Sequence, residues 1–199
     1  EVLDRIGYQM EWVFLDTPKS IGIREWSHRL KEIGKESPKS TASAIRALTA
    51  GMHLMKKLEQ LEADLKYRAG YAKEPAACVR LMRECREALS RQENLAQGFH
   101  IIRKYRKELK QIARFWEKDP VKILITGEIY TSIESAANRN LEEQLMLLGC
   151  RVKRPVTVSW WMNHTIKNTF LKFPEREGKY LPYSIGGYAK ETVAEMRKT

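Results

Sequence analysis

Apolar side chains recur every three or four positions from residue 40 to residue 118. This spacing places them along one side of an α-helix. It occurs in three successive stretches, with Leu54, Leu58, Leu61 and Leu65 in the first, Cys78, Met82, Cys85 and Leu89 in the second, and Ile102, Tyr105, Leu109, Ile112 and Trp116 in the third. Ser40 or Thr41 can cap the first helix, and Pro75 suits the first turn of the second. The pattern predicts a helical subdomain of three or four antiparallel helices over residues 40–118.

The pattern changes after Asp119-Pro120. The run VKILIT (Val121–Thr126) is largely apolar and is followed by Gly127, as expected of a strand buried on both faces. A helical face made by Leu141, Leu145 and Leu148 comes next, and a second strand is expected over Val152–Val158. Strand, helix and strand form a βαβ unit, whose strands are usually parallel. We therefore predict an α/β fold, in which the helical subdomain is followed by a Rossmann-like layer with a βαβ unit.

The two ends of the chain are less regular. Residues 1–39 are expected to form a short lead-in with a strand at Glu11–Asp16 and a helix that ends at Gly34. Residues 119–199 are expected to form the α/β domain, with a last helix over Gly186–Lys198. Because a further strand normally follows such a helix, we expect this domain to be cut short and the chain to be a piece of a longer protein.

Composition narrows the class of protein. With 43% hydrophobic residues the chain can form a real core, which excludes a disordered tail. No apolar run has the length of a membrane-spanning helix and no signal peptide opens the chain, so we expect no membrane partner and a cytoplasmic location. The net charge of +11 favours polyanions, among them nucleic acid, anionic lipid and a phosphate-rich cofactor such as coenzyme A.

The cysteines and basic residues have ordinary structural explanations. Cys78 and Cys85 share an apolar helical stripe and Cys150 stands alone, so we expect core packing and no metal bound by this chain. Residues 40–118 carry 17 basic and 9 acidic side chains. Six of the basic residues lie in the third helix, and they are Arg103, Lys104, Arg106, Lys107, Lys110 and Arg114. A solvated helix face is the simpler interpretation, and an anionic-ligand surface is the alternative.

The segment with the clearest candidate chemistry is VKILITGEIYTSIESAANRN, from Val121 to Asn140. In open parallel sheets, ligands bind beyond the carboxyl ends of the strands, and GEIY lies at such a position. The candidate ligand-binding residues are Gly127, Glu128, Tyr130, Asn138 and Arg139. Glycine permits a sharp turn or a close approach to a ligand. The alternative is a structural turn in which Glu128 and Asn138 only cap the helix, and spacing alone does not decide between the two.

The same residues carry a resemblance. The segment KILITGEIYTSIESAANRNLEEQLMLLGCRV is similar to the GEIY…AN segment of the 2-hydroxyacyl-CoA dehydratase family. The similarity is to the type represented by the D-component of 2-hydroxyglutaryl-CoA dehydratase, whose relatives include double-cubane cluster proteins and activase-related proteins. The order of the flanking segments also resembles that in the family, since RAGYAKEP precedes this segment and IGGYAKETVAE follows it. The resemblance therefore covers roughly residues 40–199. Family members tend to have an aromatic residue where this chain has Ala136.

The resemblance implies a parent function. Family dehydratases are lyases of anaerobic metabolism that remove water from a 2-hydroxyacyl-CoA through a ketyl radical, after an ATP-dependent activator protein delivers one electron to a [4Fe-4S] cluster. Cys78, Cys85 and Cys150 match none of the family's cluster-binding segments. The resemblance therefore implies a domain that contributes fold and acyl-CoA contacts and depends on the rest of its parent chain for catalysis.

A second hypothesis belongs to a different class. A basic helical module that binds nucleic acid or a partner protein also accounts for the charge of residues 40–118. The sequence contains no recognised nucleic-acid-binding motif, which argues against this partner and favours the dehydratase-like domain. The two hypotheses differ in their ligands, since acyl-CoA binding supports the first and salt-dependent nucleic-acid binding supports the second.

Overall fold

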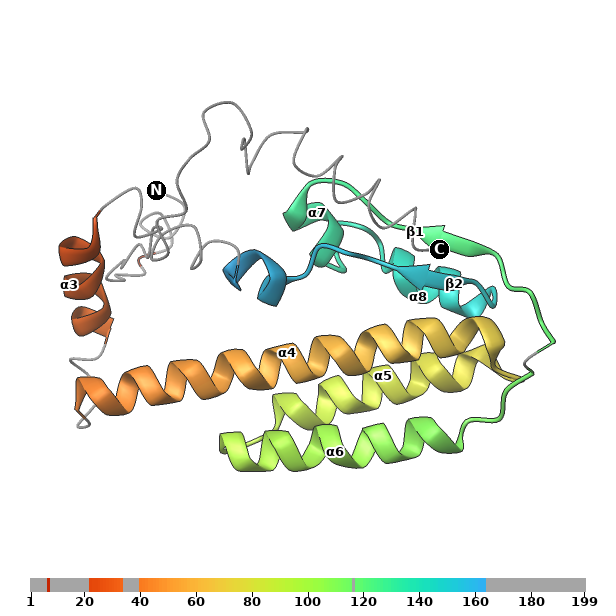
Figure 1. Cartoon of the computed structure of the whole chain (residues 1–199), viewed down its shortest axis with the longest axis horizontal. Helices are drawn as coiled ribbons and strands as arrows, with labels where there is room; N and C mark the ends of the chain where they lie inside the picture. Colours follow the sequence, from red (N-terminus) through yellow and green to blue (C-terminus); the bar gives the residue numbers. More distant parts are fainter. Residues whose placement is uncertain (1–6, 8–21, 34–39, 116, 164–199) are drawn as a thin grey trace.

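The computed structural model describes residue 7 and residues 22–33, 40–115 and 117–163 (Figure 1). Within these ranges the chain is mainly helical, with one small parallel sheet. The expected strand at residues 11–16, the helix end at Gly34 and the helix over residues 186–198 lie outside the described residues. The helix predicted after residue 22 is present as α3, Ile23–Ile33.

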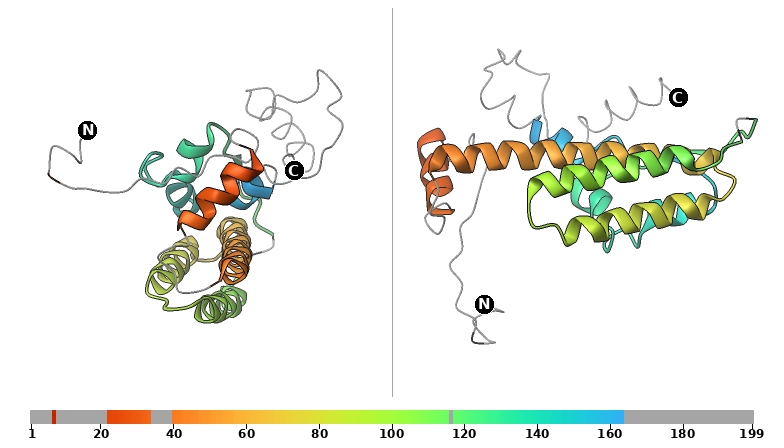
Figure 2. Two further views of the ribbon diagram at one scale, coloured as in Figure 1. Left: turned by 90° about the vertical axis from the view of Figure 1, so that its left-hand side faces the viewer. Right: turned by 90° about the horizontal axis from the view of Figure 1, so that it is seen from below.

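Three helices form the body of the molecule. They are α4 (Thr41–Tyr71), α5 (Pro75–Ser90) and α6 (Leu95–Gln111). Their starts follow the predicted signals, because the Ser40 side chain accepts from the Ser43 N–H and Pro75 occupies the first turn of α5. Asn94 caps α6 by accepting from the Gln97 N–H at 3.0 Å. Seen end-on, the three helices make a triangular bundle (Figure 2).

The predicted apolar stripes form the core of this bundle. Leu61, Leu65, Met82, Cys78 and Cys85 are among the largest fully buried side chains. Burying aliphatic side chains stabilises the fold by about 1.5–3 kcal/mol each. At one point the backbones approach closely, since a Cβ atom on Gly70 of α4 would lie 3.0 Å from the Cβ of Arg151.

The expected parallel strands are present but short. Strand β1 is Lys122–Leu124 and strand β2 is Arg151–Lys153, and they pair in parallel with Ile123 opposite Val152. Between them lie two short helices, α7 (Ile129–Ile133) and α8 (Leu141–Leu147). β2 ends before Pro155, which cannot donate a hydrogen bond to a neighbouring strand. A parallel two-stranded unit is thus shown in the described part of the chain.

The prediction that Leu141, Leu145 and Leu148 form the apolar face of α8 is wrong in part. Leu145 packs against the core, but Leu141 is 40% exposed and Leu148 is 78% exposed. Met146 and Glu143 are buried instead. The reason is that α8 packs against α4, α5 and β2 and meets charged side chains on the two long helices, so one of its buried positions is a carboxylate.

The α7–α8 and strand unit lies on one side of the bundle, over α4 and α5 (Figures 1 and 2). β2 packs directly on α4, and α8 packs on α5. Beyond β2, the chain enters another helix at residue 158, where the Ser159 N–H donates to Glu59 of α4 at 3.0 Å. The Ser159 hydroxyl also donates to the Glu59 carboxylate. No helix of the described residues combines the length and the apolar character required to cross a bilayer.

Candidate functional site

The loop after β1 carries the candidate residues of the GEIY segment. Gly127 has φ +158°, a value that side-chain-bearing residues rarely adopt, so the turn out of the strand requires glycine. Glu128 follows as the N-cap of α7, and its carboxylate accepts from the Thr131 N–H at 2.9 Å. Hydrogen bonds from the backbone N–H groups of Thr131 and Tyr130 lower the pKa of Glu128, so the capping group is a carboxylate at neutral pH.

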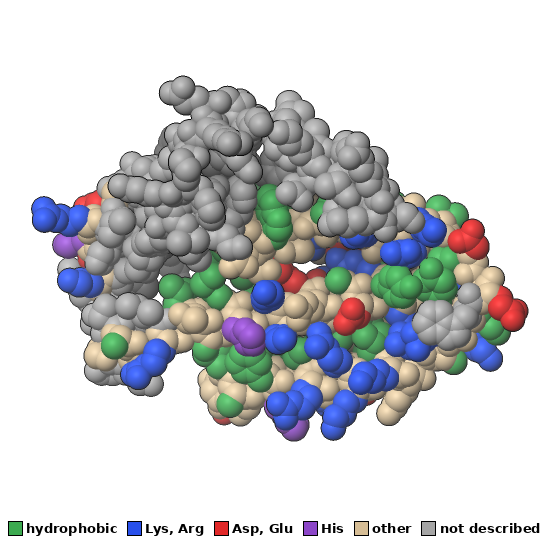
Figure 3. Space-filling view, in the orientation of Figure 1, with side chains coloured by type: hydrophobic (Ala, Val, Ile, Leu, Met, Phe, Trp, Pro, Cys, Tyr) green, Lys and Arg blue, Asp and Glu red, His purple; other side chains and the backbone are tan. Residues whose placement is uncertain are grey.

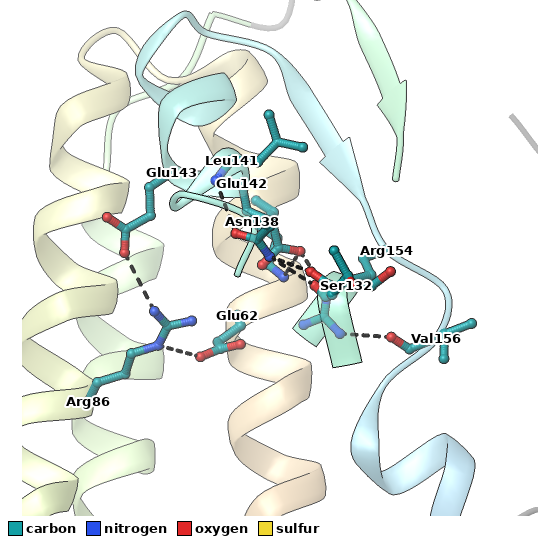
Figure 4. Close-up of polar contacts among 11 residues, drawn as sticks. Glu62, Arg86, Ser132, Asn138, Leu141, Glu142, Glu143, Arg154 and Val156 are labelled. Atoms are coloured by element: carbon teal, nitrogen blue, oxygen red, sulfur yellow. Dashed lines mark hydrogen bonds and ion pairs between the residues drawn. The ribbon is translucent and has the colours of Figure 1, made fainter. Parts of the chain in front are cut away.

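Asn138 holds the loop against α7. Its side-chain amide donates to the carbonyl oxygens of Thr131 at 3.1 Å and Ser132 at 3.2 Å. Its side-chain oxygen accepts from the Leu141 N–H at the start of α8, at 3.3 Å. Figure 4 shows Asn138 directed toward Ser132. One amide therefore joins the end of α7 to the beginning of α8, and all of its bonding groups are in use.

Tyr130 and Arg139 are exposed like Glu128, but their side chains take no part in capping α7. Tyr130 is 66% exposed. Arg139 is also exposed, has φ +56°, and its carbonyl oxygen accepts from the Gln144 side chain at 2.6 Å. The five predicted residues therefore fall into three groups. Gly127 forms the turn, the side chains of Glu128 and Asn138 fix the loop by hydrogen bonds, and the exposed side chains of Tyr130 and Arg139 do not.

A charge cluster beneath this loop was not found from the sequence. Glu142 of α8 accepts from Lys66 of α4 at 2.6 Å and from the Arg154 Nε at 2.9 Å. The side chains of Lys66 and Arg154 are only 6% and 7% exposed. Arg154 also donates to the Val156 carbonyl oxygen at 2.7 Å (Figure 4). The cluster fixes α8 and the chain after β2 to the carboxyl-terminal part of α4, which ends at Tyr71.

Protonation in this cluster follows from burial and charge. Burial lowers the pKa of Lys66 below its ordinary value, although the neighbouring Glu142 opposes the shift. Burial acts to raise the pKa of Glu142, but Lys66 and Arg154 together lower it. Glu142 is therefore an anion shared between two cations. Such an arrangement is suited to holding segments together, since every group in it already has a partner.

A second group of ion pairs joins α8 to α5. Glu143 accepts from Arg83 at 2.6 Å. It also lies 3.5 Å from Arg86, which donates to Glu62 of α4 at 2.8 Å (Figure 4). Burial acts to lower the pKa of Arg86, and Glu62 and Glu143 raise it. A local sequence signal for these pairs does not exist, because Arg83 and Glu143 are 60 residues apart.

The three cysteines are buried. Burial raises the pKa of Cys78 to about 11 and that of Cys85 to about 11. At neutral pH both are thiols, as is usual for buried structural cysteines. Among the described residues, no group of three or more His, Cys, Asp or Glu side chains is placed to hold a metal ion. Cys78 and Cys85 are thus part of the hydrophobic core of the described chain.

Comparison of the chain with known protein families, with curated proteins and with solved structures gives no match.

Proposed function

We propose that this chain is a domain of a 2-hydroxyacyl-CoA dehydratase-like protein and that it contributes acyl-CoA contacts rather than catalysis. The observation that carries the proposal is the loop at the carboxyl end of β1, beside its parallel partner β2. Ligands of open parallel sheets bind at this end of the strands. On this proposal the two-stranded unit is part of a Rossmann-like layer that further segments of the parent protein complete.

The proposed contacts come from the exposed side chains of the loop. The Arg139 guanidinium is always charged and can donate two parallel hydrogen bonds to a phosphate or carboxylate. The Tyr130 hydroxyl can donate to a carbonyl oxygen such as that of a thioester. Glu128 and Asn138 act as positioning residues, since their hydrogen bonds fix the backbone from which Tyr130 and Arg139 project.

Calorimetric titration of the full chain with a 2-hydroxyacyl-CoA tests this proposal. Arg139→Gln is expected to weaken binding about 10-fold, because one charge-assisted contact is lost, which corresponds to about 1.4 kcal/mol. Tyr130→Phe is expected to weaken binding less. Both side chains are exposed, so the melting temperature should not change.

Arg24→Gln on α3 is the matched control, because Arg24 is also an exposed arginine and lies outside the loop. It should leave the dissociation constant unchanged. The proposal fails if the unaltered chain shows no heat of binding with the thioester, or if Arg24→Gln and Arg139→Gln weaken binding equally.

A further inference from the structure

Helices α4 and α6 run side by side in the same direction. Their contacts join residues 42 to 46 positions apart in sequence, and these are the ring contact of His53 with Phe99, the ion pair of Asp64 with Arg106, and the hydrogen bond of Arg68 with Ile112 at the C-cap of α6. This nearly constant offset keeps the two helices in register. The carboxyl-terminal ends of both helices therefore lie at the same end of the molecule (Figure 1).

The outer side of α6 carries a line of exposed cations. Arg103, Lys107 and Lys110 are spaced by four and three positions, so they form a stripe that we name the basic track. In the described part of the chain, none of the three has an ion-pair partner, whereas Lys104 pairs with Glu108 at 3.7 Å. Five Lys or Arg residues and a single Glu lie within Leu95–Gln111. Figure 3 shows Lys and Arg gathered over α4 and α6 on this face.

Exposed aromatic rings lie where α4 and α6 end. Tyr67 is 40% exposed and Phe115 is 51% exposed. A cation covers part of each ring, with the Arg151 guanidinium 4.6 Å from the Tyr67 centroid and the Lys73 Nζ 4.7 Å from the Phe115 centroid. Tyr67 also contacts the Tyr71 ring at 5.2 Å, and Tyr71 accepts from the Phe115 N–H. We name Tyr67, Phe115 and their two cations the aromatic end.

We propose that the basic track and the aromatic end together bind single-stranded nucleic acid. A line of unpaired cations neutralises successive phosphates, and exposed rings stack on unpaired bases, which is the combination that single-strand-binding surfaces use. The partner is inferred from this pairing of features. An acidic protein surface would use the cations alone, and bases in a duplex are not free to stack on Tyr67 or Phe115.

This inference is independent of the acyl-CoA proposal. The aromatic end is on the side of the sheet where the strands begin, since Arg151 is the first residue of β2. The loop of Tyr130 and Arg139 is at the opposite end of β1. The resemblance and the lack of a sequence motif argued against nucleic acid. The surface nevertheless arises from three segments far apart in sequence, which no short motif records.

Fluorescence anisotropy of the full chain with a labelled oligouridine of about 12 nucleotides tests the basic track. The triple variant Arg103→Gln, Lys107→Gln and Lys110→Gln is expected to lower the slope of log affinity against log salt by about 2, because each phosphate contact contributes about 0.7. The matched control is Arg24→Gln, Lys31→Gln and Arg46→Gln, which removes the same charge from other exposed positions. Equal losses in both triple variants would show a net-charge effect and overturn the proposal.

The aromatic end has its own test. Phe115→Leu is expected to weaken binding roughly 5- to 100-fold at fixed salt, because base stacking is lost, and Phe115→Trp should retain it. Circular dichroism and the melting temperature check that each variant is folded. Unchanged affinity for Phe115→Leu overturns the proposal. So does equal affinity for a duplex of the same length, or competition by polyglutamate as effective as that by the oligonucleotide.

Discussion

At the scale of single residues, Glu142 has the most demanding environment of the described chain. Among the described residues it is the only carboxylate that forms an ion pair with Lys66 and Arg154, and all three side chains are nearly buried. Removing the negative charge leaves two cations facing each other away from water. Removing Lys66 instead leaves a neutral pair of Glu142 and Arg154. The two changes therefore differ in cost, although both break the same 2.6 Å ion pair.

We expect Glu142→Gln to lower the free energy of unfolding by about 3–5 kcal/mol, the usual cost of leaving a buried charge uncompensated. Lys66→Met should cost less than about 1 kcal/mol, because the methionine fills a similar volume and one desolvated charge is gone. Urea unfolding followed by circular dichroism measures both. The account of the cluster is wrong if the lysine variant is the less stable of the two.

The pKa of Glu142 adds a pH dependence with a definite sign. Its folded-state pKa is lowered below the ordinary value of 4.5 by Lys66 and Arg154, despite burial. Its contribution to stability is fully present above pH 4.5 and is lost as the pH falls through the lowered folded-state value. The acid limb of the stability profile should therefore flatten in Glu142→Gln.

The role of the Glu128 side chain could not be decided from the sequence. Its position after a strand and a glycine suited both a ligand contact and a helix cap. The structure places its carboxylate on the Thr131 N–H, which is the geometry of a cap. Sequence could not separate the two, because an N-cap and a ligand-facing carboxylate use the same residue type at the same place.

At the scale of elements, α4 contains two glycines in contrasting surroundings. A Cβ atom at Gly51 would have nothing within 4 Å, whereas at Gly70 it would lie 3.1 Å from the backbone nitrogen of Arg151. Gly51 lowers the stability of the helix, and no neighbouring atom requires a glycine at that position. Gly70 allows β2 to lie directly on α4.

We expect Gly51→Ala to stabilise the protein by about 0.5–1 kcal/mol, because alanine loses less conformational entropy in a helix. Gly70→Ala should destabilise it by about 1–3 kcal/mol, because the backbone of β2 must move. Thermal unfolding of the pair measures the difference. If both variants gain stability equally, β2 does not approach α4 as described.

The helices of the bundle could be predicted because each buries one continuous apolar stripe, and periodicity reports such stripes directly. The parallel pairing of β1 and β2 followed from an apolar run, a helix and a second run. α8 could not be predicted as well. Its buried residues include Glu143, whose partners Arg83 and Arg86 come from a different helix, and a hydrophobicity pattern assigns a charged residue to the surface. The ion pairs beneath the candidate site were missed for the same reason.

At the scale of the whole molecule, α4 is the element on which the rest is assembled. It contacts α5, α6, α8 and β2, and Leu61, Leu65 and Ala69 within it are completely buried. Its first turns, by contrast, extend beyond α5 and α6 (Figure 1). Backbone amides in the first turns of α4 should therefore exchange their hydrogens through local opening, whereas those in its buried part should exchange through global unfolding.

Native-state hydrogen exchange tests this expectation. The amides of Leu61, Leu65 and Ala69 should exchange only on global unfolding, with a free energy equal to that from urea unfolding. Amides at residues 46–50 should exchange through local fraying and be insensitive to low urea. Equal protection along α4 would mean that the helix opens as a single unit.

One side of α4 is covered by β2 and by the Glu142–Arg154 pair, which are made much later during synthesis of the chain. A ribosome adding about 5–20 residues per second needs roughly 4 to 18 seconds to proceed from Lys66 to Arg154. During that interval α5 and α6 can already cover two sides of α4, but the side that receives β2 and Glu142 has no partner. The nascent chain therefore presents a helix with one uncovered flank, and a chaperone that shields newly made polypeptides has a defined period in which to act on it.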